Sequence, residues 1–222
     1  MKLKLPGTGL FALVLLLLAG VAQAKVQLPR LFSDGAVLQR DQPLRIWGTA
    51  DAGAPVHVDF NGSAVDVAAG ADGRWSATLP AQGAGGPYQL TVRSGDSARN
   101  VRDLLVGDVW LASGQSNMEW PVASSDDVDA VIASAGDTQI RHFKIPKSWS
   151  EKPEHDLVGG GWVAASPQTV ANFSAVGYAF ARELRAATGV PIGIIDSTWG
   201  GSNIQTWMSA ASLGIDEKGL AQ

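Results

Sequence analysis

Cysteine is absent from the 222 residues, and histidine occurs only three times. The chain can therefore form no disulfide, and its three scattered histidines give no metal-binding pattern, so no metal site is predicted. Basic residues are also scarce, because 17 Lys and Arg stand against 21 Asp and Glu and no basic run is present. This composition argues against a nucleic acid or an anionic membrane surface as a partner.

The one long apolar run lies at the N-terminus and has the form of a secretory signal peptide, residues 1–24. Lys2 and Lys4 form the positive start, Leu10–Ala19 the apolar core, and Ala22-Gln23-Ala24 the cleavage site. A membrane anchor is the alternative, which the short core disfavours. Cleavage after Ala24 would leave 15 basic and 21 acidic residues, a net charge of −6, and no stable membrane anchor. The simple form of the signal predicts a bacterial periplasmic or secreted protein.

Residues 25–103 alternate apolar and polar side chains in short runs, as half-buried strands do. Asn61-Gly62 is a hairpin signal between two such runs. Short strands at even spacing predict a small antiparallel β-sandwich as a first domain. The predicted strands are Leu44–Gly48, Val56–Phe60, Ala64–Val67, Trp75–Leu79 and Tyr88–Val92.

After Val101 the pattern changes to apolar strands separated by helices, and residues 104–222 are expected to form a second, α/β domain with a parallel sheet. The strand candidates are Val109–Ala112, Ile140–Ile145 and Ile192–Ile195. One helix is expected at Asp126–Ala135, with Ser124 or Ser125 as its cap. A second helix is expected between the cap Ser174 and Gly189, with Val176, Phe180, Leu184 and Ala187 as its apolar face.

Ser116 lies just beyond the first of these strands, inside a small polar turn. A serine beyond the C-terminal end of a strand can project its hydroxyl into a crevice, while N–H groups of the turn point to the same place. This is the geometry that an acyl-transfer nucleophile needs. The Gly200-Gly201 turn follows the strand Ile192–Ile195 in the same way, so both turns are expected at one edge of the sheet.

Five segments resemble, in order, the sequence blocks of the sialate O-acetylesterases, a branch of the SGNH (GDSL-like) hydrolases. They are Leu31–Gln39, Gly114–Trp120, Phe173–Tyr178, Val190–Gly193 and Trp199–Trp207. A Gly-x-Ser motif alone would be weak evidence, whereas five ordered blocks, spread over nearly the whole chain beyond residue 24, are strong evidence. The resemblance implies a small all-β sandwich followed by part of an SGNH-type, flavodoxin-like α/β domain with a parallel sheet.

The resemblance also implies which residues form the site, with Ser116 as the catalytic nucleophile and no cofactor. Gly177 and Gly201 are candidate oxyanion or substrate-binding residues, with helix packing and a tight turn as the respective alternatives. Gln115 and Asn117 are candidates of the same kind, and the alternative is that they are ordinary polar turn residues.

The general base is missing from this pattern. In the family it is a histidine with an aspartate three residues earlier, and the sequence contains no such pair. His57 and His142 lie on strand candidates, and His155 lies in a loop beside Glu154 and Asp156, where a neighbour in sequence does not orient an imidazole as a triad acid does. We therefore expect the chain to be the N-terminal portion of a longer esterase.

The resemblance implies a serine esterase that removes O-acetyl groups from acetylated sugars such as O-acetyl sialic acid. Two alternatives stay open: an esterase for acetylated xylan or pectin, and a non-catalytic carbohydrate-binding protein. Among the eight tryptophans, Trp120, Trp199 and Trp207 are candidates for stacking on sugars, with core packing as the alternative for each. The remaining strand tryptophans Trp47, Trp75 and Trp110 are expected in the core.

Overall fold

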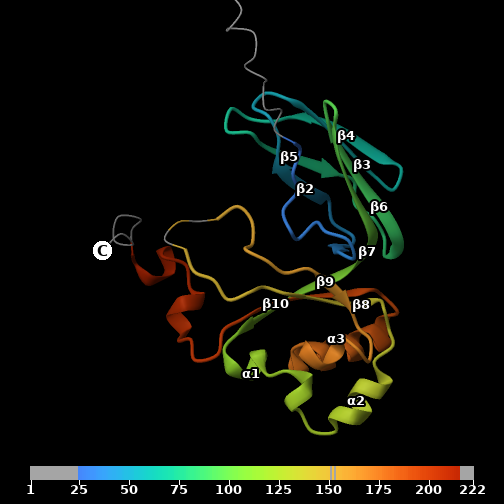
Figure 1. Ribbon diagram of the computed structural model, residues 1–222, viewed down its shortest axis with the longest axis vertical. Helices are drawn as coiled ribbons and strands as arrows, with labels where there is room; N and C mark the ends of the chain where they lie inside the picture. Colours follow the sequence, from blue (N-terminus) through green and yellow to red (C-terminus); the bar gives the residue numbers. More distant parts are fainter. Residues whose placement is uncertain (1–24, 151, 153, 216–222) are drawn as a thin grey trace, which may run out of the picture.

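The computed structural model describes residues 25–215 apart from 151 and 153, so the predicted signal peptide lies outside the described residues. This part of the chain forms an eight-stranded mixed sheet, a two-stranded sheet and three α-helices (Figure 1). The strands are β1 Val37–Gln39, β2 Leu44–Thr49, β3 Pro55–Phe60, β4 Ser63–Ala68, β5 Arg74–Leu79, β6 Gly85–Ser94, β7 Ser97–Gly114, β8 Ile140–Lys144, β9 Trp162–Ala164 and β10 Ile192–Thr198. The helices are α1 Ser116–Glu119, α2 Val128–Ser134 and α3 Ala175–Thr188, and the 3-10 turns are η1 Val122–Ser124, η2 Val170–Asn172, η3 Ile204–Trp207 and η4 Ala211–Leu213.

The N-terminal part consists of β1 to β6 and the first half of β7. There β4, β3, β6 and β7 pair antiparallel in that order, while β2 pairs with β5. Side chains of both sheets, such as Ile46 on β2 and Leu90 on β6, are buried in one hydrophobic core. Asn61 and Gly62, between β3 and β4, both have positive φ, so the hairpin signal is confirmed, as are the five predicted strands.

β7 belongs to both parts of the molecule. Its 18 residues pair antiparallel with β6 as far as Val106, parallel with β1 over Leu105–Gly107, and parallel with β10 over Asp108–Gly114. The predicted domain boundary after residue 103 therefore falls inside a continuous strand. Leu104 and Val106, which lie beyond it, are buried in the N-terminal core. The boundary and the free-standing sandwich over residues 25–103 stay predictions.

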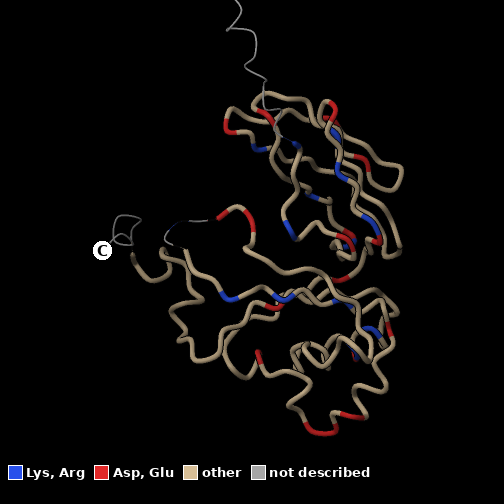
Figure 2. Tube along the Cα trace, in the orientation of Figure 1, with Lys and Arg blue, Asp and Glu red and all other residues tan. Residues whose placement is uncertain are grey.

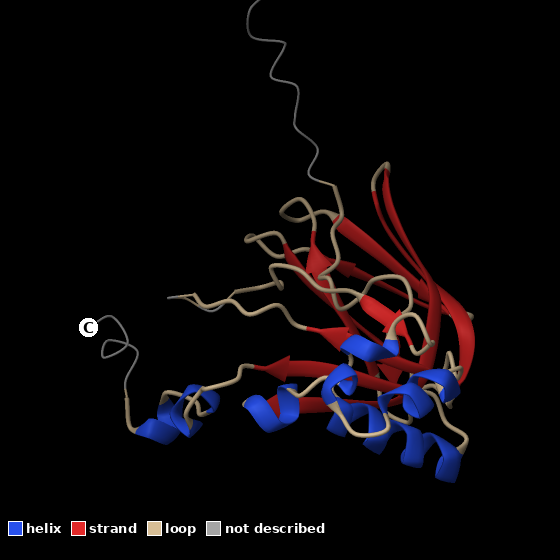
Figure 3. Ribbon diagram, turned by 60° about the horizontal axis from the view of Figure 1, so that its bottom comes forward, coloured by secondary structure: helices blue, strands red, loops and turns tan. Residues whose placement is uncertain are grey.

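Beyond β7 the sheet continues in the order β7-β10-β8-β9, in which β7, β10 and β8 are parallel and β9 is antiparallel. The predicted parallel pairing of the apolar strands is thus confirmed. All three α-helices lie on one face of this sheet (Figure 3). The opposite face meets the N-terminal part, where the buried Arg141 on β8 donates hydrogen bonds to the main-chain oxygens of Gly35 and Asp103, both at 2.8 Å.

Helix α3 has the predicted ends but not the predicted buried face. Ser174 Oγ caps it by accepting from the N–H of Gly177, and Gly189 ends it with a φ of +69°. The face that packs on the sheet carries Gly177, Tyr178 and Ala181, while Val176 and Phe180 are exposed. The prediction of an apolar stripe through Val176 and Phe180 is wrong because small residues let the helix approach β10 closely: a Cβ on Gly177 would lie 3.4 Å from Ile194 Cγ2.

Helix α2 begins later than predicted and lacks a serine cap. It starts after Asp127, whose φ of 54° is left-handed, and Ser125 Oγ donates instead to the carbonyl of Val122 in η1. Ser125, one of the two predicted helix caps, therefore forms a hydrogen bond within the preceding turn and does not cap α2.

The tryptophans on strands divide between core and surface. Trp75 is buried as predicted, but Trp47 is 37% and Trp110 45% exposed. Each exposed ring instead meets a phenylalanine edge-on, Phe32 for Trp47 and Phe180 for Trp110.

Charged residues are interspersed along both parts of the trace, and acidic residues gather near the start of α2 (Figure 2). Within the described residues, no helix combines the length and apolar character needed to cross a bilayer.

Candidate active site

Ser116 begins α1 immediately after β7 ends at Gly114. Its exposed Oγ donates to Gln115 Oε1 at 3.3 Å, and the carbonyl of Gln115 accepts from the N–H groups of Met118 and Glu119, both at 3.0 Å. Ser116 and the exposed Asn117 occupy the first turn of α1, where helix geometry leaves N–H groups without intrahelical acceptors. The serine turn therefore combines an accessible hydroxyl with main-chain donors.

The loop after β10 lies directly against this turn. The N–H of Trp199 donates to the carbonyl of Gly114 at 2.9 Å. A Cβ on Gly200 would lie 3.6 Å from both Cα and Cβ of Ser116, which is ordinary van der Waals contact, and 2.7 Å from Glu119 Oε2, so a side chain here would displace the Glu119 carboxylate. The prediction that the two turns share one edge of the sheet is confirmed.

Glu119 in α1 contacts both the loop after β10 and the loop after β8 at this edge of the sheet. Its Oε2 accepts from the N–H of Gly200 at 2.5 Å, and its Oε1 pairs with Lys147 Nζ at 2.6 Å in the loop after β8. The hydrogen bond from Lys147, helped by that from Gly200, holds the pKa of Glu119 below its ordinary value against the effect of burial. Because the N–H of Gly200 is engaged, the neighbouring Gly201 is the better candidate donor for a ligand; it is exposed, has a φ of +82° and has open space beside its Cα.

Gly177, the other glycine assigned to the site, is buried. Its N–H donates to Ser174 Oγ at 3.0 Å, and Ser174 Oγ donates in turn to the carbonyl of Met118 at 2.7 Å. The N–H of Gly177 thus already has an acceptor, so the geometry favours helix packing over the predicted oxyanion role. Gly177 supports the serine turn through Ser174.

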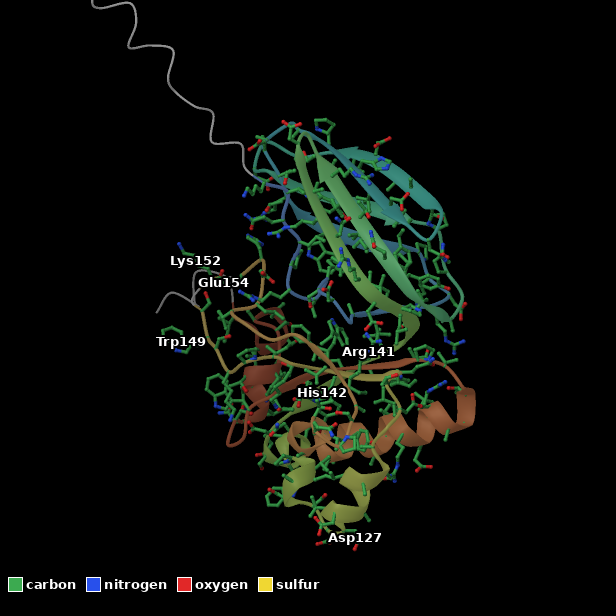
Figure 4. The ribbon with its side chains drawn as sticks, turned by 45° about the vertical axis from the view of Figure 1, so that its right-hand side comes forward. Asp127, Arg141, His142, Trp149, Lys152 and Glu154 are labelled. Atoms are coloured by element: carbon green, nitrogen blue, oxygen red, sulfur yellow. The ribbon has the colours of Figure 1, made fainter. Side chains whose placement is uncertain are left out.

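A buried charged network lies behind the site. Asp196 on β10 is 1% exposed and accepts from Lys144 Nζ at 2.9 Å, His142 Nε2 at 3.1 Å and Thr198 Oγ1 at 2.7 Å. Burial raises the pKa of Asp196, but these three hydrogen bonds outweigh it and hold the pKa below its ordinary value. The ring of His142 stacks on Phe173, with centroids 4.4 Å apart, in the interior of the α/β part (Figure 4).

None of the three histidines is a hydrogen-bond partner of Ser116 in the described structure. His57 pairs with Asp66 at 2.8 Å, and His155 contacts Arg74 of the N-terminal part. His142 is in register with Ile194, which pairs with Trp110 on β7. Trp110 precedes Gly114 by four residues, about 13 Å of strand, so His142 lies well short of the serine turn.

A pocket of about 580 Å³ adjoins the serine turn. We define this tryptophan pocket by the residues lining it, which are Ile145–Trp149, Ser197–Ser202, Thr206 and Trp207. The predicted stacking residues Trp199 and Trp207 line it, whereas Trp120 does not; the indole N–H of Trp120 donates to the carbonyl of Ser124. No group of three or more His, Asp or Glu in the described residues is arranged to hold a metal.

Three residues of this region were not found from the sequence: Glu119, Lys147 and Trp149. Glu119 had a usable signal, since a residue three positions after Ser116 lies on the same side of a helical turn. Lys147 and Trp149 follow the strand Ile140–Lys144, so the rule that brings ligands to strand ends applies to them as well. Their position at the pocket depends on a loop that carries no periodic pattern.

The mixed sheet with parallel strands and helices on one face, with Ser116 beyond a strand end, is compatible with an SGNH-like α/β domain. The family model described as carbohydrate esterase, sialic acid-specific acetylesterase matches residues 106–215. The chain is a sialate O-acetylesterase-like protein.

Named relatives agree with this assignment. The sequence is 32% identical to the sialate O-acetylesterase of Rattus norvegicus over 76% of the chain and 34% of the relative, and 30% identical to that of Mus musculus over 91% and 42%. The structure is similar to a carbohydrate acetylesterase from Xanthomonas citri, with a TM-score of 0.85 and 54% identity over 89% of this chain and 45% of the other. The chain thus spans less than half the length of these relatives.

Proposed function

We propose that this chain carries the nucleophile of an acetylesterase that acts on O-acetylated carbohydrates. The observation that supports this proposal is the contact between the Ser116 turn and the Gly200-Gly201 loop at the C-terminal edge of the parallel strands. Relatives named as sialate O-acetylesterases and as a carbohydrate acetylesterase support the choice of an acetyl ester as the bond that is cleaved.

In the proposed reaction, Ser116 Oγ attacks the acetyl carbonyl and loses its proton to a base. The N–H groups of Ser116, Asn117 and Gly201 are the candidate donors to the resulting oxyanion. The bond to the sugar oxygen then breaks, the sugar hydroxyl leaves with a proton, and water releases acetate from the acetylated serine. Gln115 holds the serine hydroxyl before the attack through the hydrogen bond already described.

Among the described residues, no side chain that could act as a general base forms a hydrogen bond with the Ser116 hydroxyl. With an exposed serine and oxyanion donors alone, catalysis is expected to stay at about 10³–10⁴-fold over water, far below a complete triad. The chain should therefore hydrolyse p-nitrophenyl acetate slowly, and this slow reaction should depend on Ser116.

The test compares p-nitrophenyl acetate turnover, and the acetylated protein detected by mass spectrometry, in the unchanged chain and in Ser116→Ala. Ser113→Ala, an exposed serine three residues earlier on β7, is the matched control. Loss of the acetylated species only in Ser116→Ala supports the nucleophile. Equal acetylation in all three proteins would reject it and favour a non-catalytic carbohydrate-binding protein. Fast turnover that depends on Ser116 would instead show that a base lies within the chain.

Export is a further proposal, which rests on the signal-like residues 1–24. A periplasmic or secreted protein should begin at Lys25 when purified from its natural host, and intact-mass measurement reads this directly. A mature protein that retains Met1 or Lys2 would contradict it.

A further inference from the structure

The tryptophan pocket has a composition that acetyl transfer alone does not require. It starts beside the nucleophile, because Gly200 lines it and approaches Ser116 closely, and it extends to the exposed loop that carries Trp149 (Figure 4). Trp149 is 80% exposed and Trp199 40%, so neither ring is fully used in packing. The pocket volume of about 580 Å³ lies within the range of small-molecule sites, about 300–1,000 Å³, which are typically lined by aromatic side chains and a few polar groups.

The chemistry of the lining fits a sugar ring. A pyranose has a face of C–H groups, which packs on an indole, and a rim of hydroxyls, which need hydrogen-bond partners. Ser148 and Thr206, which carry hydroxyl groups, line the pocket together with the tryptophans; the Thr206 hydroxyl donates to the carbonyl of Asn203 at 2.7 Å and can still accept a hydrogen bond. Trp207 is already fixed, since its indole N–H donates to Ser202 Oγ at 2.9 Å, and Ser202 Oγ donates to the carbonyl of Trp199 at 2.7 Å. A pre-ordered surface of this kind lowers the entropic cost of binding.

The charges at the edge of the pocket are matched in pairs. Lys147 is held by Glu119 at 2.6 Å, and Lys144 by the buried Asp196 at 2.9 Å. A sugar carboxylate would have to compete with these carboxylates for either lysine. An uncharged ring would leave both ion pairs in place.

We propose that the tryptophan pocket binds an uncharged pyranose ring of an acetylated oligosaccharide or polysaccharide, stacked on Trp149 and Trp199. The proposal rests on the proposed function for the position of the acetyl group at Ser116. Ring binding does not depend on hydrolysis and can be measured separately. Trp149, at the exposed end, would contact the part of this ring that lies farthest from the ester.

The experiment follows the indole N–H signals of the 15N-labelled chain by NMR during titration with unacetylated sugars. Xylotetraose and cellotetraose serve as the uncharged probes, and N-acetylneuraminic acid and trigalacturonic acid as the carboxylated probes. Signals are assigned by single Trp→Phe substitutions. We expect an uncharged probe to shift the signals of Trp149 and Trp199 and to leave that of the buried Trp75 unchanged.

Trp149→Ala should weaken binding of the uncharged probe about tenfold, from the loss of one aromatic contact. The control Trp110→Ala, a ring of 45% exposure outside the pocket, should leave binding unchanged. Because Trp149 is so exposed, its removal should not alter the thermal melt, so a folding defect would be recognised as such.

Absence of shifts with both uncharged probes at millimolar concentration, or stronger binding of a carboxylated probe, would overturn this proposal. Binding of an uncharged probe without acetylation of Ser116 would leave the pocket assignment intact and reject the esterase. Acetylation of Ser116 without ring binding would reject the pocket assignment alone.

Discussion

Removal of the Glu119 carboxylate should loosen the edge of the sheet where the serine turn and the glycine loop meet. The side chain of Glu119 is 24% and that of Lys147 43% exposed. A hydrogen bond to a charged group contributes about 1.5–3 kcal/mol when buried, and we take the lower end here because solvent reaches the site. A half-exposed ion pair adds about 0.5 kcal/mol. Glu119→Ala should therefore lower the free energy of unfolding by about 2 kcal/mol.

Glu119→Gln separates the two contributions. The glutamine carbonyl can still accept from the N–H of Gly200 but no longer pairs with Lys147, so its cost should be about 0.5–1 kcal/mol. For a protein of this size the melting temperature falls by about 2–4 °C per kcal/mol, which gives about 4–8 °C for the alanine variant. Differential scanning calorimetry at neutral pH measures both shifts, with Glu183→Gln as a control because Glu183 is 80% exposed.

The effect should also depend on pH in a definite direction. The pKa of Glu119 is lowered in the folded protein, so its stabilisation is fully present above its unfolded pKa and is lost as the pH falls through the lowered folded pKa. The difference between the unchanged protein and Glu119→Gln should therefore shrink on acidification. Melting temperatures that match in all three proteins at neutral pH, or a difference that grows in acid, would refute the reasoning.

Three further predictions concern stability. Asp196→Ala should cost about 3 kcal/mol in urea denaturation, because it leaves His142 and Lys144 without their buried partner; Lys144 can partly reach solvent, which keeps the value at the low end. Gly107→Ala should cost about 3 kcal/mol, since its Cβ would lie 2.0 Å from the carbonyl oxygen of Pro191, whereas Gly136→Ala, with open space around it, should change stability by less than about 0.5 kcal/mol. Finally, a fragment of residues 25–107 should melt cooperatively and at a higher temperature than one of residues 25–103, because the longer fragment keeps Leu104 and Val106 in the core; equal melts would show that the end of β7 adds nothing.

The sequence predicted the regular elements well because their patterns are local. Alternation marks the strands of the N-terminal part, and the cap Ser174 and stop Gly189 mark α3. The buried face of α3 was predicted wrongly because helical periodicity alone does not show that Gly177 and Ala181 would be selected for close approach to β10. The extent of β7 was also missed, since its change of partners from β6 to β10 depends on tertiary pairing.

At the site, too, some features follow from local sequence patterns and others depend on tertiary contacts. Ser116 and its position beside the glycine loop follow from strand order and from the motif. Glu119 lies in α1, whereas Lys147 and Trp149 lie in the loop after β8, and the pairing of Glu119 with Lys147 depends on a contact between residues far apart in the chain. The N–H of Gly177 donates to the helix cap Ser174, and this contact favours helix packing over an oxyanion role for Gly177. The sequence alone left both interpretations open.

The continuity of β7 has a consequence for how the gene can vary. Side chains alternate between the two faces of a strand, so a one-codon deletion near Leu104 would turn every later side chain of β7 to the opposite face. The buried Ala112 would exchange places with the exposed Leu111, and the serine turn would start from the wrong side of the sheet. Pairing on both edges around Leu105–Gly107 leaves no loop to absorb such a change. We expect insertions and deletions among homologues to collect in the loop between β8 and β9, where the pocket wall can lengthen while the frame of β7 is preserved.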